Sequence, residues 1–179
     1  DMILVGYLAF FDAPKASAKS SVEALQRLRV TPKILTGDQL AVASSVCRRV
    51  GIPVEHMLTG EGLDELSDTA LAQEVEKCHV FAELTPGQKV RIVSALRANG
   101  HTVGFLGDGI NDIPALCEAN VGISVDTAVD AAKDAADVVL LEKDLGVLEQ
   151  GILEGRKTFT NMLKYIKITA SSNFGNILS

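Results

Sequence analysis

The sequence predicts an α/β domain in which a parallel sheet is covered by helices on both faces. Short apolar runs alternate with helical patterns along the 179 residues, as expected for βαβ units, in which helical crossovers connect parallel strands. Hydrophobic residues make up 47% of the chain and charged residues 22%, the composition of a globular domain with a substantial core. We therefore expect a doubly wound parallel sheet, followed by a long C-terminal helix.

The expected elements follow one another in a regular order. The clearest helix carries Ala43, Val46, Cys47 and Val50 at the i, i+3, i+4, i+7 spacing of a buried face. Strands are expected at residues 3–11, 32–35, 80–84, 102–106, 121–125 and 138–141. Helices are expected at residues 16–29, around 43–50, from residue 86, after residue 112, and from residue 144 towards the C-terminus. Residues 57–77 have weaker patterning and are expected to form a loop and a helix.

Charge and cysteine content restrict the classes of partner. A formal charge of −6, the absence of Trp and an aromatic content of 4% argue against nucleic acid, which recruits clustered cations and stacking rings. Cys47, Cys78 and Cys117 match no zinc-binding or CxxC spacing. They are expected to be reduced thiols in a cytosolic compartment.

The first candidate motif is Thr36-Gly37-Asp38, which follows the second expected strand. A hydroxyl group and backbone N–H groups that open a helix form an anion-binding site. In open parallel sheets, ligands bind beyond the carboxyl ends of the strands, where this motif lies. The alternative is that Asp38 only caps the next helix.

The second candidate is Lys89, in the first turn of the helix that Pro86 opens. Lys89 shares a helix face with Ile92, Val93 and Leu96, which are expected to face the sheet. A lysine on that face is unusual unless its ammonium group reaches a negative charge. The alternative is a surface lysine whose stem covers apolar neighbours.

The third candidate is the run from Gly107 to Asp112, which reads Gly-Asp-Gly-Ile-Asn-Asp and follows an expected strand. Two carboxylates at such a turn suit Mg²⁺, which takes one or two carboxylates together with phosphate oxygens and water. The alternative is an ordinary acidic turn in which Asp112 caps the following helix.

The order of these parts resembles the haloacid-dehalogenase-like phosphotransferases, in which an aspartate attacks phosphorus beside Mg²⁺ and a lysine. The whole chain resembles the phosphorylation (P) domain of P-type cation-transporting ATPases, most closely the bacterial magnesium-transporting branch. The resemblance implies a haloacid-dehalogenase-like Rossmannoid fold. It is carried by Thr36-Gly-Asp38, Pro86-x-Gln-Lys89, Gly107-Asp-Gly-Ile-Asn-Asp-Ile-Pro-Ala-Leu116, Val121-Gly-Ile-Ser124, Leu140-Leu-Glu-Lys-Asp144 and Thr169-Ala-Ser-Ser-Asn-Phe-Gly-Asn176.

The resemblance implies a part of an ATP-driven cation pump that transports Mg²⁺ and forms an aspartyl-phosphate intermediate. Asp108 would coordinate the catalytic Mg²⁺, Asp112 would support that metal site, and Lys89 would balance phosphoryl charge. Its partners would be the nucleotide-binding, actuator and membrane domains of the same pump, with ATP as substrate. Contacts to the phosphoryl group or the nucleotide are implied for Thr36, Gly37, Asp38 and Asn111.

The C-terminal segment has a different character from the rest. No charge follows Lys167, and this uncharged stretch is shorter than the roughly 20 mainly apolar residues that span a bilayer. We expect residues 1–157 to form the P domain and residues 158–179 the cytoplasmic start of a membrane helix, in contact with lipid. Asn173 and Asn176 are candidates for the path of the transported ion. Both ends of the chain are expected to be cut from a longer protein.

Two departures from the family pattern limit what this chain can do alone. The Asp-Lys-Thr-Gly-Thr phosphorylation motif is absent from the sequence, so the isolated chain is expected to be inactive. Glu83 stands where a basic residue is common and would weaken nucleotide binding on that rim. A soluble phosphatase of the same superfamily would use Asp12 as nucleophile, but Pro14 occupies the place of its second acid. A non-catalytic receiver-like module is the third alternative.

Overall fold

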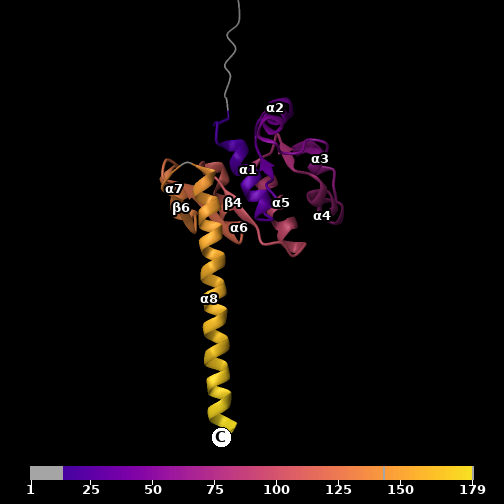
Figure 1. The fold of residues 1–179 in the computed structure, drawn as a ribbon. Coiled ribbons are helices and arrows are strands. Elements are labelled where there is room, and N and C mark those ends of the chain that lie inside the picture. Colours follow the sequence, from indigo (N-terminus) through magenta and orange to yellow (C-terminus); the bar gives the residue numbers. More distant parts are fainter. Residues whose placement is uncertain (1–13, 143, 179) are drawn as a thin grey trace, which may run out of the picture.

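The computed structural model describes residues 14–142 and 144–178, so the strand expected at residues 3–11 lies outside the described part. Strands and helices alternate along these residues and end in one long helix (Figure 1). The strands are β1 (Ile34–Leu35), β2 (Met57–Thr59), β3 (Val80–Ala82), β4 (Gly104–Leu106), β5 (Val121–Val125) and β6 (Val138–Leu140). The helices are α1 (Ala18–Arg27), α2 (Leu40–Val50), α3 (Gly60–Asp64), α4 (Asp68–Lys77), α5 (Pro86–Ala98), η1 (Ile110–Asp112, a 3₁₀ turn), α6 (Ile113–Glu118), α7 (Asp130–Ala135) and α8 (Leu145–Leu178).

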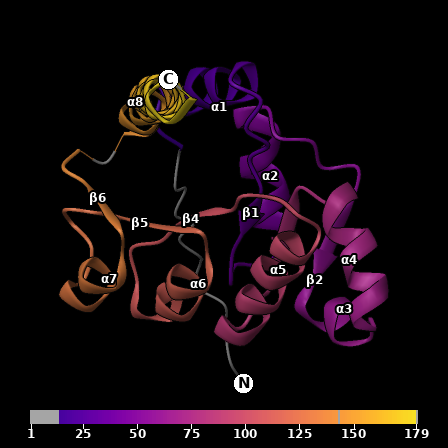
Figure 2. The ribbon, with the colours of Figure 1, turned by 90° about the horizontal axis from the view of Figure 1, so that it is seen from below.

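The described strands form two parallel sheets, in the orders β1-β3-β2 and β4-β5-β6. Leu35 pairs with Phe81 in the first sheet, and Leu106 pairs with Ile123 in the second. Figure 2 shows β4 and β1 as neighbours in one row of strands. Among the described residues, β1 and β4 are edge strands that each have a single strand partner. The parallel α/β fold predicted from the sequence is therefore confirmed.

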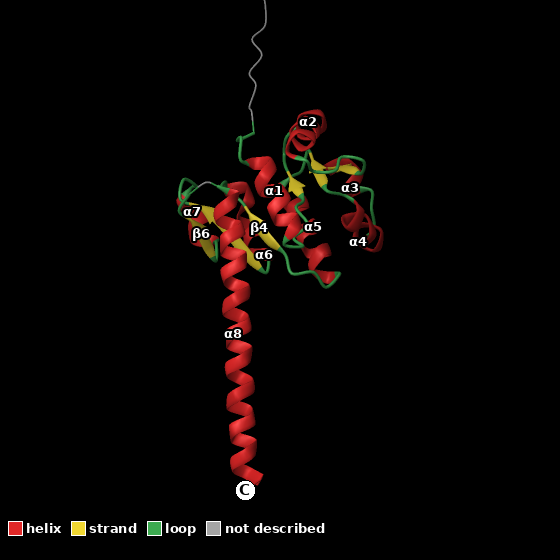
Figure 3. Ribbon diagram, in the orientation of Figure 1, coloured by secondary structure: helices red, strands yellow, loops and turns green. Residues whose placement is uncertain are grey.

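Helices cover both faces of the first sheet. On β3, Val80 and Ala82 pack in a core cluster with α1 and α2, whereas Phe81 packs in another with α3, α4 and α5. This alternation follows from the two-residue period of a strand, whose successive side chains point to opposite faces. All three side chains are fully buried. Figure 3 shows the helices and strands that make up these layers.

Helix α5 connects the two sheets. Ile92 belongs to the core cluster of the first sheet, and its neighbour Val93 belongs to the cluster of the second. Leu35 packs against both clusters, so the two halves share one continuous apolar interior. The first turn of α5 carries Lys89, which is consequently fixed relative to both sheets.

The expected strands at residues 32–35, 80–84, 102–106, 121–125 and 138–141 are confirmed with small differences in length. The expectation for residues 57–77 was incomplete, because this segment contains the three-residue strand β2 and two helices. Half-buried Met57, Leu58 and Thr59 show no alternation by which the strand could be recognised. Helix α7 is only six residues long and was not predicted.

The long C-terminal helix forms in spite of four glycines within it. Val147 and Leu148 pack against the second core cluster and anchor the beginning of α8. Residues 154–172 are all exposed, and Figure 1 shows the helix projecting well away from the domain. Within the described residues, no helix has the length and apolar character needed to cross a bilayer.

The end of α4 is tied to the turn after α5 by Glu76. Its carboxylate accepts hydrogen bonds from Asn99 Nδ2 at 2.6 Å and lies 2.9 Å from His101 Nε2. The hydrogen bond from Asn99, followed by that from His101, holds the pKa of Glu76 below its ordinary value. A lowered carboxyl pKa stabilises the fold above the unfolded-state value, and this stabilisation is lost as the pH falls through the folded value.

We predict that Glu76→Gln lowers the urea midpoint at pH 7, and that this difference from the unmodified chain narrows as the pH falls below about 4, the ordinary range for glutamate. Urea titrations over this pH range measure the effect, and Glu65→Gln, at an exposed carboxylate after α3, serves as control. A difference that stays constant with pH would show that the ionised carboxylate is not responsible.

Candidate functional site

The three sequence motifs follow strands of the two parallel sheets. Thr36 comes directly after β1, Gly107 comes directly after β4, and the segment after β3 leads into α5 and Lys89. The carboxyl ends of parallel strands meet at one edge of a sheet, which is where ligands bind in open α/β folds. The three motifs therefore lie at the carboxyl ends of the strands, where the sequence predicts a ligand-binding site.

A direct ion pair joins the second motif to the third. Lys89 Nζ lies 2.7 Å from Asp112 Oδ1, and the two side chains are only 12% and 16% exposed. Lys89 therefore does not behave as a surface lysine, which was the alternative interpretation. An ion pair that is shielded from water in this way is costly to break, because one charge would remain buried without its partner.

The loop after β4 is held in shape by close packing and by hydrogen bonds. A Cβ atom on Gly107 would lie 2.5 Å from Cβ of Asp112, so only glycine lets the loop fold over in this way. The buried hydroxyl of Ser124, on β5, donates to the carbonyl oxygen of Gly107 at 3.0 Å. The backbone N–H of Asp112 donates to the carbonyl oxygen of Gly109. The position of the Asp112 carboxylate is thus set by the fold.

Both oxygens of Asp112 have protein partners. Oδ1 contacts Lys89, and Oδ2 accepts the backbone N–H of Gly109 at 3.4 Å. Asp112 occupies the N-cap position of α6, but its side chain makes no capping hydrogen bond, so the simple capping alternative is wrong. Asp108 and Asn111 are exposed in the same loop. The loop therefore presents one exposed carboxylate next to one that is held by a lysine.

The carboxylates of this loop suit a metal ion whose remaining ligands come from a substrate and from water. The described part of the chain holds no group of three or more His, Cys, Asp or Glu side chains that could bind a metal ion. Mg²⁺ needs only one or two protein carboxylates when phosphate and water complete its octahedron. Asp108 and Asp112 would together meet that smaller requirement.

The Thr36 turn is closed by its own side chains. Thr36 Oγ1 donates to Asp38 Oδ2 at 2.9 Å, and the backbone N–H of Asp38 donates to Thr36 Oγ1 at 3.1 Å. The N-cap residue of α2 is Gln39, whose side chain makes no capping bond. The alternative in which Asp38 caps α2 is therefore wrong. Glu83 supplies the acceptor instead, since its Oε1 receives the N–H of Leu40 at 3.1 Å.

The sequence reasoning missed the structural roles of Glu83 and Ser124. The charge of Glu83 departs from the family pattern, but its contact with Leu40, 43 positions away, leaves no local signal in the sequence. Ser124 belongs to the Val121-Gly-Ile-Ser run, where a polar residue inside an apolar strand was the available signal. Both residues hold motif loops in place. Asn173 and Asn176 lie on α8, and their side chains fall outside the described part of the structure.

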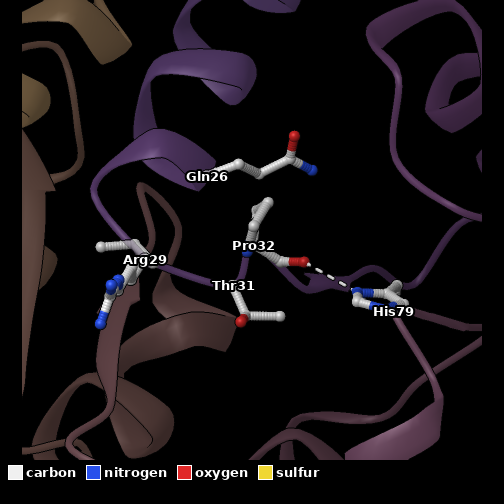
Figure 4. A pocket seen from close by; sticks show the side chains of 6 residues that line it. Gln26, Arg29, Thr31, Pro32 and His79 are labelled. Carbon is white, nitrogen blue, oxygen red and sulfur yellow. Dashed lines mark hydrogen bonds between the residues drawn. The ribbon is translucent and has the colours of Figure 1, made fainter.

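A shallow hollow of about 330 Å³ lies away from these motifs (Figure 4). His79 Nδ1 lies 3.4 Å from the carbonyl oxygen of Pro32 on its wall. These residues precede β3 and β1, so the hollow lies at the opposite end of the strands from Thr36. It does not belong to the candidate site. It is lined by Gln26, Arg29, Val30, Thr31, Pro32 and His79.

Comparisons with known proteins agree with this geometry. Residues 3–120 match the family model of the haloacid dehalogenase-like hydrolases. "Magnesium-transporting ATPase, P-type 1" of Salmonella typhimurium is 55% identical over 179 residues, which is 100% of this chain and 20% of that protein. The protein of the same name from Escherichia coli K12 gives the same identity and coverage. "Calcium-transporting ATPase 1" of Bacillus cereus is 36% identical over 182 residues, 100% of this chain and 20% of that protein.

Solved structures of P-type ATPases share the fold. A zinc-transporting PIB-type ATPase in the E2.Pi state gives a TM-score of 0.68 at 28% identity, covering 86% of this chain and 21% of that one. The catalytic domain of a CPx-ATPase gives a TM-score of 0.60 at 27% identity, covering 78% and 45%. This chain thus spans about a fifth of the length of the relatives named above. With the motifs gathered at one strand edge and the family model matching more than half of its residues, the chain belongs to the haloacid dehalogenase-like hydrolase family.

Proposed function

We propose that this chain is the P-domain portion of a P-type ATPase that pumps Mg²⁺ by way of an aspartyl phosphate. The observation that carries the proposal is the shielded Lys89–Asp112 ion pair at the strand edge, in the loop that also presents Asp108. The 55% identity to magnesium-transporting ATPases supports Mg²⁺ as the transported ion. Residues 1–157 would form the P domain, and residues 158–179 the cytoplasmic start of a membrane helix.

Each motif residue has a role in this proposal. Asp108 would coordinate Mg²⁺, and Asp112 would support the site while holding the ammonium group of Lys89. Bound Mg²⁺ would neutralise charge that develops on the phosphoryl oxygens. Thr36 would turn its hydroxyl from Asp38 towards the phosphoryl group when that group is bound. Additional contacts to the phosphoryl group or to ATP are assigned to Gly37, Asp38, Lys89 and Asn111.

The edge strands suggest where the missing nucleophile enters. β1 and β4 carry the Thr36 turn and the Asp108 loop and have one described strand partner each. The apolar side chain of Leu106, on β4, is 41% exposed. A parallel strand inserted between β1 and β4 would cover this surface and end between Thr36 and Asp108. We assign that strand to the segment of the pump that carries Asp-Lys-Thr-Gly-Thr.

The projecting part of α8 would connect the P domain to the membrane. Six large apolar side chains are exposed along it, as expected for surface that other parts of a larger protein cover. Lys164 and Lys167 would remain at the lipid interface, where cationic side chains are stable. The domain itself would lie in the cytoplasm, next to the nucleotide-binding and actuator domains. The exposed side chains are Phe159, Met162, Leu163, Tyr165, Ile166 and Ile168.

We predict that the 179-residue chain alone neither hydrolyses ATP nor becomes phosphorylated, because supporting groups cannot replace an acceptor aspartate. Incubation with labelled ATP and Mg²⁺, followed by acid quench, should trap no acyl phosphate. Label on Asp12 would contradict the proposal and favour the soluble phosphatase.

In the full-length pump, Asp108→Asn and Lys89→Ala should each reduce phosphoenzyme formation by about 100-fold or more, because the first removes a hard-cation ligand and the second a positive charge that stabilises the transferred group. Rapid-quench phosphorylation measures both effects. Lys133→Ala, at a lysine on α7 that pairs with the exposed Asp130, is the matched control. Near-normal phosphoenzyme levels in the Asp108→Asn variant would show that Asp108 is an ordinary turn residue and not a metal ligand.

Asn173→Ala and Asn176→Ala should reduce ion transport and ion-stimulated ATPase activity in the full-length pump, whereas partial reactions that need no ion should persist. Residues three apart lie on about the same helix face, as a shared ion path requires. Transport assays in reconstituted vesicles measure the effect. Unchanged ion dependence in well-expressed variants would identify both amides as packing residues.

A further inference from the structure

Glu83 has an unusual backbone conformation at the edge of the candidate site. It follows β3 directly, its side chain is exposed, and its φ angle is 58°. Residues other than glycine, asparagine and aspartate seldom occupy this left-handed region. Such a conformation costs free energy and persists only where surrounding contacts enforce it. The contacts of Glu83 therefore indicate what the conformation achieves.

Three hydrogen bonds connect Glu83 and its neighbour to the Thr36 turn. The N–H of Glu83 donates to the carbonyl oxygen of Asp38 at 2.9 Å, and the N–H of Leu84 donates to that of Thr36 at 3.0 Å. The carboxylate of Glu83 accepts the N–H of Leu40 at 3.1 Å. These bonds restrain the turn at Thr36, at Asp38 and at Leu40, where α2 begins.

The carboxylate of Glu83 accepts a backbone N–H at the start of α2, a role that an N-cap side chain usually has. Leu40 is the first residue of α2, and the side chain of the local N-cap residue Gln39 makes no capping hydrogen bond. A carboxylate at this end of a helix satisfies a backbone donor and complements the positive pole of the helix. Glu83 supplies both from a distant segment and so connects the start of α2 to the end of β3.

Beyond Glu83, the chain leads directly into α5, the helix that carries Lys89. A Cβ atom on Gly60 would lie 2.5 Å from the carbonyl oxygen of Glu83, so α3 packs tightly against this segment. Gln88 Oε1 accepts the N–H of Thr85 at 2.8 Å and so closes the capping box of α5. Lys89 follows in the first turn of α5. Glu83 thus lies on a short, restrained path between the Thr36 turn and Lys89.

We propose that Glu83 is a positioning residue that holds the Thr36-Gly37 turn in register with Lys89, so that both can contact one phosphoryl group. The inference rests on the proposed function, because it assigns the phosphoryl group to Thr36 and Lys89. It opposes the expectation from sequence that the negative charge of Glu83 weakens nucleotide binding. The charge of Glu83 is instead directed at the backbone of α2.

Two substitutions in the full-length pump distinguish a positioning role of Glu83 from an effect of its charge on nucleotide binding. Glu83→Gly removes the carboxylate and suits a φ angle of 58°, so the backbone is preserved. Glu83→Gln removes the charge but keeps an oxygen that can accept the N–H of Leu40. The readouts are inhibition of ATPase activity by orthovanadate, which reports on the phosphoryl site, and equilibrium binding of ATP. Glu23→Ala, at an exposed carboxylate on α1, is the control.

Glu83→Gly should weaken the apparent orthovanadate affinity by roughly five- to tenfold, the scale of a lost helix cap, and should not tighten ATP binding. Glu83→Gln should stay within about twofold of the unmodified pump in both readouts, because the cap is retained. Unchanged orthovanadate affinity in Glu83→Gly, or tighter ATP binding in both variants, would overturn the proposal. An unmodified pump that forms no acyl phosphate would instead overturn the proposed function, whatever the Glu83 variants do.

Discussion

The ion pair between Lys89 and Asp112 joins the two halves of the domain at the edge where the motifs gather. Lys89 belongs to α5, which packs against both core clusters, and Asp112 belongs to the loop that follows β4. Because both side chains are largely shielded from water, neither charge can move away without leaving the other buried and unpaired. The relative position of helix and loop is therefore tightly constrained.

Other contacts at the site maintain this arrangement. Gly107 leaves room for Asp112 to fold over the loop, and Ser124 holds the carbonyl group of Gly107 from inside the sheet. Glu83 performs the equivalent task for the Thr36 turn. A catalyst that relies on positioning and electrostatics needs its groups fixed before substrate binds. In this domain the restraint comes from residues next to the chemical motifs as much as from the motifs themselves.

Local patterns in the sequence predicted most of the fold. The apolar strand at residues 121–125 and the periodic face containing Cys47 and Val50 mark buried elements without further information. The motif loops were found because acids, glycines and a lysine occur at strand ends. The strand β2 and the short helix α7 were missed, since few residues define them and tertiary packing decides their structure. The tasks of Glu83 and Ser124 depend on contacts between distant segments, which no local pattern reveals.

In the proposed pump, the ends of β1 and β4 and the first turn of α5 form one phosphoryl site, completed by a strand from another segment. This arrangement can be tested with a structure of the full-length protein with Mg²⁺ and a fluoroberyllate phosphate analogue. We expect a strand between β1 and β4, with Thr36 and Lys89 both within hydrogen-bond distance of the analogue and Asp108 bound to the metal. Direct pairing of β1 with β4, or an analogue bound away from Lys89, would contradict it.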